Sequence, residues 1–121
     1  PAKHPLDTTP VDIPIEIWDE IIDINLRGYL LGCKYAIPHM IARGGGSIIN
    51  TASNSGIAGD LARVAYGTSK GGIITLSKYV ATQYGKQNIR CNSISPGVVL
   101  TAALEATVPG LKEVVVPVKV L

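Results

Sequence analysis

The sequence predicts an α/β fold with the order helix, strand, helix, strand. Two short β-rich runs, residues 47–51 and 89–95, flank a helical segment at residues 64–84. A connection of that length joins parallel strands, because antiparallel neighbours need only a short hairpin, and it should cross over with a right-handed sense. The composition agrees, since 46% of the 121 residues are hydrophobic and 17% are charged, which favours a buried core.

Proline and apolar spacing define the first two segments. Residues 1–14 contain four prolines among Asp and Thr residues, which predicts an irregular N-terminal loop. From Ile15 a helix is expected, because apolar residues recur at three-and-four spacing. This stripe comprises Trp18, Ile21, Ile22, Leu26, Tyr29, Leu30, Cys33, Ile37 and Ile41. Pro38 cannot donate a backbone hydrogen bond, so we expect a kink or an early end there.

Glycines and prolines separate the remaining elements. Three glycines, at 44–46, end the first helix and lead into the strand at 47–51. After a polar loop, the second helix should stop at Gly85, a residue suited to the left-handed position that follows a helix. Pro96 and Gly97 then end the second strand.

The carboxyl-terminal part gives a weaker pattern. A short helix is expected near Ala102, while the valines of residues 111–121 are interrupted by Pro117, so no structure is assigned to them. The prediction is a single incomplete domain, 1–121. It consists of an N-terminal loop (1–14), a core (15–103) and an unassigned tail (104–121).

Composition and charge argue against several classes of function. Cys33 and Cys91 lie in apolar runs, which indicates buried thiols in a reducing, cytoplasmic compartment rather than a disulfide. A net charge of +2 without a basic stripe argues against nucleic acid as a partner. His4 and His39 lack ligand neighbours, so no metal site is expected. Apolar runs are all shorter than the roughly 18 residues that a membrane span needs.

The α/β topology gathers polar residues at one edge of the sheet. The carboxyl ends of parallel strands meet the amino end of the connecting helix there, which is where open α/β sheets bind ligands. Ser53, Tyr66, Pro96, Gly97 and Thr101 are therefore expected to converge. Two strands are too few for a stable sheet, and parallel strands need cover on both faces, so part of the fold is expected to be missing.

Tyr66 and Lys70 form the chemical pair of most interest, because at i, i+4 spacing their side chains share one helix face. Spacing alone is weak evidence, since chance gives roughly 0.3 such pairs, and a solvated lysine beside a half-buried tyrosine is the structural alternative. At the ligand edge the ammonium favours the phenolate. Lowering the Tyr66 pKa from about 10 to about 7 requires roughly 4 kcal/mol. The Ser53 hydroxyl would then hold a reacting carbonyl or alcohol oxygen in line.

For residues near the Tyr66–Lys70 pair we favour structural roles. Ser55 and Ser69 are weaker candidates for the reactive hydroxyl. Gly71 and Gly72 cost about 1 kcal/mol each inside a helix, which indicates close packing rather than a ligand contact. Asn25 lies on the apolar stripe and, as an inward-facing amide, must find hydrogen-bond partners.

Several groups of residues form a linked pattern over about residues 16–103. They are Trp18-Asp19, Asn25-Leu26, Pro38-His39-Met40, Gly46-Ser47-Ile48-Ile49-Asn50, Ser53, Tyr66-Gly67-Thr68-Ser69-Lys70 and Asn92-Ser93-Ile94-Ser95-Pro96-Gly97. In order and spacing, this pattern resembles the short-chain dehydrogenase/reductase family. The resemblance implies a partial Rossmann-like fold, a doubly wound parallel sheet without its N-terminal dinucleotide-binding half. Glycines 44–46 do not replace the missing pyrophosphate loop, because they precede a strand.

The resemblance also implies an activity, reversible hydride transfer between a secondary alcohol and a ketone with NAD or NADP. Tyr66 would be the general acid/base, Lys70 would lower its pKa and bind the nicotinamide ribose, and Ser53 would orient the substrate oxygen. Asn25 would hold a kinked helix turn and a water that links Lys70 to solvent. The segment that contacts the nicotinamide end of the cofactor would comprise Pro96, Gly97, Val99 and Thr101.

The resemblance also implies that parts of the family's fold lie outside this chain. The family's glycine-rich turn would precede Pro1 and its last helix and strand would follow Leu111. We therefore expect oxidoreductase activity from a longer parent and little or none from these 121 residues alone.

The alternative to an enzyme is a non-catalytic association module that pairs through its two long helices, which are also the expected route to a homo-oligomer. A nonfunctional product of a broken reading frame is the third. The small-molecule substrate and the choice between NAD and NADP stay open.

Overall fold

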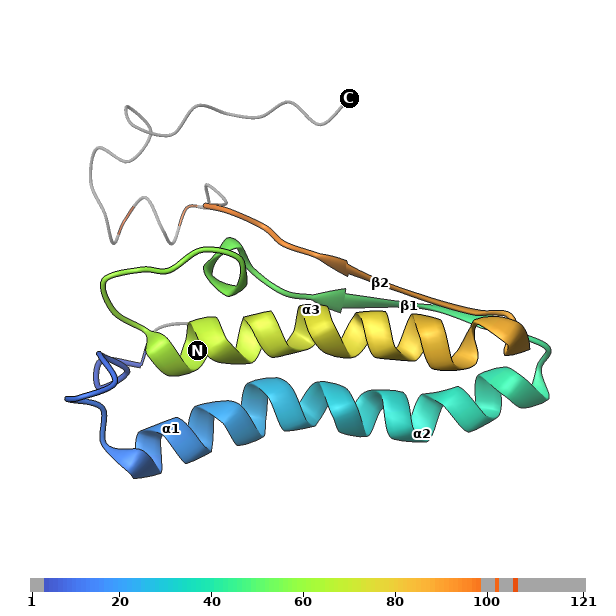
Figure 1. The fold of residues 1–121 in the computed structure, drawn as a ribbon, viewed down its shortest axis with the longest axis horizontal. Coiled ribbons are helices and arrows are strands. Elements are labelled where there is room, and N and C mark those ends of the chain that lie inside the picture. Colours follow the sequence, from blue (N-terminus) through green and yellow to red (C-terminus); the bar gives the residue numbers. More distant parts are fainter. Residues whose placement is uncertain (1–3, 99–101, 103–105, 107–121) are drawn as a thin grey trace.

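The computed structural model describes residues 4–98 together with residues 102 and 106, and its elements follow the expected order (Figure 1). In chain order they are α1 (Ile15–Ile22), the π-helical turn η1 (Asp23–Arg27), α2 (Gly28–Ala42), β1 (Gly46–Thr51), the 3-10 turn η2 (Asn54–Gly56), α3 (Val64–Tyr84), the 3-10 turn η3 (Gly85–Gln87) and β2 (Ile89–Ile94). The predicted α/β order is confirmed. The predictions near Ala102 and for the tail fall almost wholly outside the described residues.

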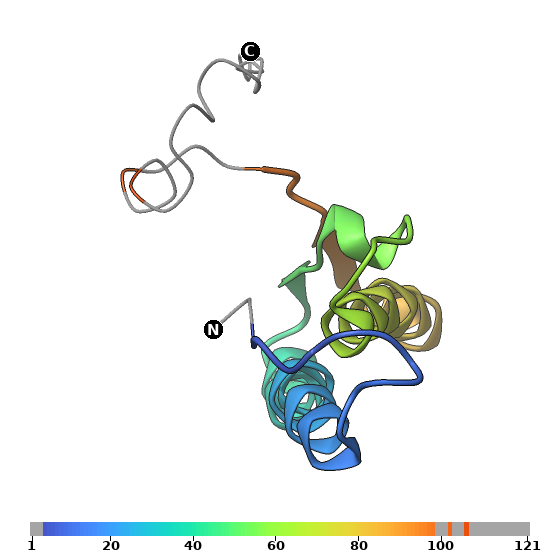
Figure 2. The same ribbon diagram turned by 90° about the vertical axis from the view of Figure 1, so that its left-hand side faces the viewer.

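The two strands form a parallel sheet whose register runs from Gly46 opposite Ile89 to Thr51 opposite Ile94. The parallel pairing predicted from the length of the crossover is thereby confirmed. The helices run opposite to the strands and cover the same face of the sheet (Figures 1 and 2). The carboxyl ends of both strands and the amino end of α3 therefore lie at one end of the molecule.

The core lies between this sheet face and the helices. One buried face of α3 points toward it, formed by Ala65, Ser69, Ile73, Ser77 and Val80. Their spacing of three or four residues places them on one side of the helix. A hydrophobic cluster joins α3 to α2 and β2; it consists of Cys33, Ile37, Val80, Ile89 and Cys91.

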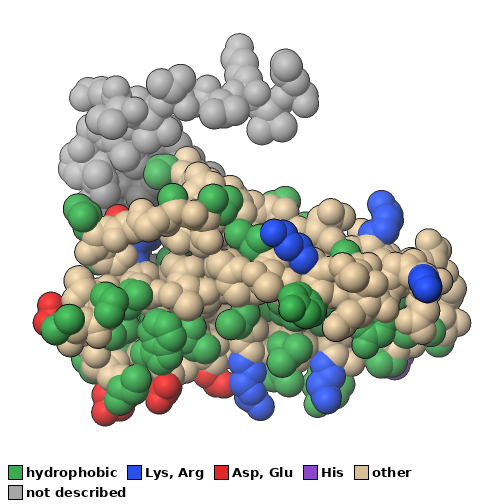
Figure 3. Space-filling view, in the orientation of Figure 1, with side chains coloured by type: hydrophobic (Ala, Val, Ile, Leu, Met, Phe, Trp, Pro, Cys, Tyr) green, Lys and Arg blue, Asp and Glu red, His purple; other side chains and the backbone are tan. Residues whose placement is uncertain are grey.

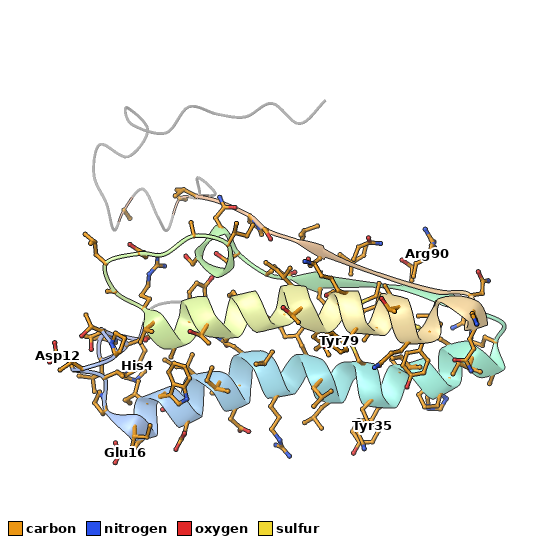
Figure 4. The ribbon with its side chains drawn as sticks, viewed as in Figure 1. His4, Asp12, Glu16, Tyr35, Tyr79 and Arg90 are labelled. Atoms are coloured by element: carbon orange, nitrogen blue, oxygen red, sulfur yellow. The ribbon has the colours of Figure 1, made fainter. Side chains whose placement is uncertain are left out.

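The other face of the sheet carries no cover within the described part of the chain. Ile49 and Ile94 point to this face and are 66% and 51% exposed, and Arg90 projects from β2 away from the helices (Figure 4). Parallel sheets are normally covered on both faces.

The long first helix is interrupted at the π turn Asp23–Arg27 rather than at Pro38. α2 continues past Pro38 to Ala42, so the expected early end is wrong. Proline removes one backbone hydrogen bond, and Pro38 itself lies on the exposed side of the helix. The neighbouring Ile37 is 5% exposed in the hydrophobic cluster and holds this turn against the core.

The left-handed residue after α3 is Asn88, not the expected Gly85. Gly85 has a φ of −59° and continues into η3, whereas Asn88 has a φ of 63°. Asparagine tolerates this region because its short amide can bond locally. The Asn88 Nδ2 donates a hydrogen bond to the Gly44 carbonyl at 3.0 Å. This bond ties the turn before β2 to the turn before β1.

Asp7 caps the amino end of α3 from a distant part of the sequence. Its carboxylate oxygens accept hydrogen bonds from the backbone N–H groups of Ala65 and Tyr66, both at 2.9 Å. The backbone carbonyls of Asp7 and Thr8 accept from Arg63 and Val64. The first N–H groups of a helix have no partner within it, so these four bonds satisfy them. Asp7 is only 3% exposed, which places the cap inside the structure.

Both cysteines are buried free thiols, as predicted. Burial raises the pKa of Cys33 above its ordinary value of 9.0, and the nearby Cys91 raises it further. Burial also raises the pKa of Cys91, against a hydrogen bond with Ser77 that lowers it. Both side chains therefore stay protonated and unreactive at neutral pH.

Removing the cap should destabilise the protein. We expect Asp7→Ala to lower the free energy of unfolding by about 2 kcal/mol, because two buried N–H groups lose a charged acceptor. Asp7→Asn should cost less, since one oxygen remains. The exposed Asp12, on the same N-terminal loop (Figure 4), is the matched control, and Asp12→Ala should change stability by less than about 0.5 kcal/mol. Urea unfolding followed by circular dichroism measures these values, and equal losses at Asp7 and Asp12 would contradict the cap.

Burial of the thiols should be visible in their chemistry. At pH 8 iodoacetamide should label the folded chain at least about 100-fold more slowly than the urea-unfolded chain. The raised pKa values also make stability depend on pH. The unfolded thiols ionise first, so their contribution is complete below pH 9.0 and is lost as the pH rises further. A Cys33→Ala, Cys91→Ala double variant should lack this part of the alkaline decrease. Rapid labelling of the folded chain would argue against buried thiols.

Candidate active site

The segments that follow β1 and β2 run side by side at the end of the sheet. The Ala52 N–H donates to the Ile94 carbonyl at 2.7 Å, and the Asn54 N–H donates to the Pro96 carbonyl at 3.1 Å. Gly97 packs so closely on Asn54 that an added Cβ would lie 2.8 Å from its Nδ2. Ser53, between these two hydrogen-bonded residues, is thus held beside Pro96 and Gly97.

Lys70 joins α3 to the end of β1. Its Nζ donates a hydrogen bond to the Thr51 carbonyl at 3.0 Å. The same ammonium lies 5.7 Å from the centre of the Tyr66 ring and 5.6 Å from that of Tyr29 on α2, within the range of cation–π attraction. The Tyr66 and Lys70 side chains therefore lie close together beside the carboxyl end of β1, with Tyr29 as a neighbour that the sequence did not suggest.

The η2 turn, which follows Ser53, packs against α3. The Ser53 Oγ accepts a hydrogen bond from the Ser55 N–H at 3.2 Å, so its own O–H stays free to donate. A Cβ on Gly56 would meet the Gly71 nitrogen at 2.5 Å, and a Cβ on Gly67 would meet the Ser55 carbonyl at 3.0 Å. Glycines thus allow the η2 backbone to touch the first turns of α3. This confirms the packing role expected of Gly71.

Asn25 connects the π turn to the helix that carries Tyr66. Its Nδ2 donates to the Ser69 Oγ at 3.4 Å, and that hydroxyl donates to the Tyr66 carbonyl at 2.6 Å. Ser69 is fully buried, so it acts as a bridge and not as the reactive hydroxyl. The next residue, Leu26, packs its side chain on Gly72, where an added Cβ would lie 2.8 Å away. The inward amide of Asn25 has therefore found a partner on α3.

Arg63 and Asp7 are site neighbours that the sequence did not identify. The Arg63 guanidinium carbon lies 5.5 Å from the centre of the Tyr66 ring. Arg63 also lines a cavity of about 600 Å³ between the loop 55–62, residues 8–10 and α3. The sequence held one signal for Asp7, since the residue before α3 is Arg63, whose side chain provides no cap for the helix. A cap from elsewhere in the chain was therefore needed.

Other predictions about the site are only partly covered. Val99 and Thr101 lie outside the described residues, so the structure does not place the end of the segment expected to contact the nicotinamide. Among the residues that the structure describes, no group of three or more metal-ligating side chains is gathered. Over the same residues, no helix is both long and apolar enough to cross a membrane.

Comparisons with known proteins identify the relatives of this chain. A family model described as "Enoyl-(Acyl carrier protein) reductase" matches residues 2–117. A Bradyrhizobium diazoefficiens protein named "Probable short-chain type dehydrogenase/reductase" is 46% identical over 107 residues, covering 87% of this chain and 38% of the relative. The 7alpha-hydroxysteroid dehydrogenase of Bacteroides fragilis is 45% identical over 97 residues, covering 80% of this chain and 38% of the relative.

A solved structure gives the same answer for the fold. Levodione reductase superimposes with a TM-score of 0.76 at 33% identity, covering 84% of this chain and 40% of that one. This chain therefore spans about two fifths of the length of the proteins that it matches. The match of a family model to nearly all of its residues, together with the shared fold, shows that this chain belongs to the short-chain dehydrogenase/reductase family of oxidoreductases.

Proposed function

We propose that this chain carries the proton-transfer machinery of an NAD(P)-dependent oxidoreductase that interconverts a secondary alcohol and a ketone. The observation that supports the proposal most directly is the position of Lys70, whose ammonium is tied to the end of β1 and faces the Tyr66 ring. In this proposal the Lys70 ammonium stabilises the negative charge that forms on the phenol oxygen when its proton leaves. Tyr66 is accordingly the general acid/base.

The roles of the other residues follow from their donors. The Ser53 O–H donates to the reacting oxygen of the substrate and holds it beside Tyr66. In the oxidation direction, Tyr66 takes the hydroxyl proton, and in reduction it returns that proton to the carbonyl oxygen. A bound nicotinamide would supply the hydride chemistry, as acceptor of the hydride from the alcohol C–H bond in oxidation and as its donor in reduction. Asn25 steadies the helix turn between Tyr66 and Lys70 through Ser69.

The residues present fit the nicotinamide-ribose end of the cofactor. Lys70 has three N–H donors, and its hydrogen bond to Thr51 leaves two for ribose hydroxyls. Pro96 and Gly97 follow β2 at the same edge and would flank the nicotinamide, as would Val99 and Thr101. The pyrophosphate needs a glycine turn between a strand and a helix. The segment between β1 and α3 does not have that spacing, so we assign no pyrophosphate contact to this chain.

The substrate is a small molecule, and its class differs among the relatives. The Bacteroides fragilis relative is named for a hydroxysteroid and the structural relative for levodione. Membership of the family therefore leaves the substrate open. The buried free thiols support a reducing compartment, and we propose the cytoplasm.

Association through the long helices is a second candidate, favoured by exposed apolar side chains. Leu30 and Tyr35 on α2 and Tyr79 on α3 are 51%, 66% and 60% exposed. Hydrophobic side chains lie along both helical segments in the space-filling view (Figure 3), and Tyr35 points outward from α2 (Figure 4). Such a surface suits a second copy of the chain and is compatible with catalysis.

Light scattering tests the association. We expect the chain to form a dimer or larger oligomer at micromolar concentration, and Tyr35→Glu with Leu30→Glu should shift it toward monomer, because charges are costly in an apolar interface. The control is Arg90→Glu, on the opposite face of the sheet, which should leave the oligomer unchanged. A wild-type chain that stays monomeric would exclude this candidate.

The catalytic proposal is best tested in a chimera, because the chain covers only part of its relatives. The matching segment of the Bacteroides fragilis enzyme is replaced by this chain, and turnover of a 7alpha-hydroxysteroid and a panel of simpler alcohols is followed by nicotinamide absorbance. Tyr66→Phe should lower kcat/KM by at least about 100-fold, and Ser53→Ala and Lys70→Met by similar factors. Tyr79→Phe is the matched control and should retain activity. A folded chimera whose activity survives Tyr66→Phe would refute the proposal.

A further inference from the structure

Tyr29 brings a second aromatic ring to the Lys70 ammonium from a separate helix. The Lys70 Nζ lies 5.6 Å from the centre of the Tyr29 ring on α2 and 5.7 Å from that of the Tyr66 ring on α3. The two helices lie side by side in both ribbon views (Figures 1 and 2). A cation within about 6 Å of a ring centre is attracted to the electron-rich face of the ring. The ammonium is therefore held by rings on two elements at nearly equal distances.

The backbone of β1 supplies a third contact to the same ammonium, the hydrogen bond from Nζ to the Thr51 carbonyl at 3.0 Å. A lysine side chain has many rotamers, so fixing it in one position costs more conformational entropy than fixing a short side chain. Contacts from α2, α3 and β1 together offset this cost. The Tyr29 ring is the contact that comes from neither the helix of Lys70 nor the strand.

The π turn Asp23–Arg27 leads directly into the helix that carries Tyr29, which is the second residue after it. A π turn contains more residues than an α-helical turn, so the residues that follow it are rotated relative to those of a continuous α-helix. Within the turn, Asn25 bonds to Ser69 at 3.4 Å. Asn25 and Tyr29 thus face Ser69 and Lys70, two consecutive residues of α3.

The surroundings of Tyr29 favour a strong contact with the cation. Tyr29 is half-buried and borders a cavity of about 430 Å³ between α2 and β1, whose lining includes Cys33, Met40 and Ile48. Attraction between a cation and a ring is greater where water is partly excluded. Because the ammonium faces the ring of Tyr29, a phenylalanine at this position would keep the contact.

We propose that Tyr29 is a positioning residue, which holds the Lys70 ammonium where it serves both Tyr66 and the ribose of the cofactor. This inference rests on the proposed function, which gives Lys70 those two tasks. Tyr29 acts through Lys70 and is assigned no contact with the substrate. Its ring favours the charged ammonium and restrains the motion of the lysine side chain. Losing the ring therefore weakens cofactor binding and proton transfer together.

The first test measures how fast acetic anhydride acetylates Lys70 in the whole 121-residue chain, relative to Lys34 and Lys78 in the same sample, by mass spectrometry. Only the neutral amine attacks the anhydride, and a ring face favours the ammonium. Tyr29→Leu should therefore speed labelling of Lys70 about three- to tenfold, whereas Tyr29→Phe should stay within about twofold of wild type. The matched control is Tyr35→Leu, at the exposed tyrosine of the same helix, which should leave Lys70 labelling unchanged.

Fluorinated phenylalanines separate the electrostatics of the ring from its size. Phenylalanines that carry one, two or three fluorines at position 29 have nearly the same shape, but each fluorine withdraws electron density from the ring face. Labelling of Lys70 should accelerate with each added fluorine, because the attraction between ring and cation weakens stepwise. Equal Lys70 rates across the series would overturn the proposal, as would an equal acceleration of Lys34 and Lys78.

The second test uses the chimera described for the catalytic proposal. Tyr29→Leu should raise KM for the nicotinamide cofactor at least about threefold and also lower kcat, whereas a smaller fraction of folded enzyme lowers the apparent kcat alone. Tyr29→Phe should keep both constants near those of the parent chimera. In a chimera that already carries Lys70→Met, Tyr29→Leu should have almost no further effect, because the shared contact is already absent. An undiminished effect in that background would contradict the proposal.

The outcomes separate this inference from the proposed function. An active chimera whose KM and kcat are unaffected by Tyr29→Leu would overturn the inference alone. A folded chimera that transfers no hydride would overturn the proposed function, and labelling of Lys70 that depends on Tyr29 would still support the contact between the two side chains. Melting curves identify any variant that fails to fold. The fluorinated series, which preserves the packing of the ring, is then decisive.

Discussion

The candidate site depends on how closely the turn after β1 approaches α3. Gly56 and Gly71 meet with their backbones in contact, and a methyl group on Gly56 would lie 2.5 Å from the Gly71 nitrogen. Because no side chain separates them, η2, the turn that follows Ser53, is held against the helix turn that carries Lys70. The Lys70 hydrogen bond to Thr51 closes the same junction from the other side. A wider separation would leave the hydroxyl, the phenol and the ammonium on unconnected segments.

Buried polar groups extend this junction into the interior. Asn50, at 5% exposed, donates to the Ser77 hydroxyl at 2.9 Å, which itself donates to the Ile73 carbonyl. Asn25 and Ser69 repeat this pattern nearer to Tyr66. Small polar residues on the inner face of α3 thus fix the position of the helix relative to β1 and η1. A buried polar group without a partner costs free energy, so each bond penalises sliding of the helix along the sheet.

Local patterns predicted much of the fold. The helix at 64–84 has the predicted bounds, and the parallel pairing followed from its length, because both depend on residues near in sequence. The Asp7 cap was not foreseen, and the kinked turn at Asn25 was expected only from the family resemblance. Leu26 in the π turn packs on Gly72, and the cap is a carboxylate far in sequence from the helix that it serves. These contacts form only when distant segments fold together, and propensity does not report them.

The residues proposed for proton transfer and the residues of the loop before α3 are positioned by different kinds of contact. The groups proposed for proton transfer sit on α3 and at the end of β1, which sheet topology brings to one edge in any protein with this order of elements. Arg63 and Asp60 instead belong to the loop before α3, and its conformation is set by Asp7, Ser55 and the residues of that loop. The sequence and length of loops can vary among relatives while the sheet that they connect is kept. Relatives named for a hydroxysteroid and for levodione are therefore compatible with one arrangement of Ser53, Tyr66 and Lys70.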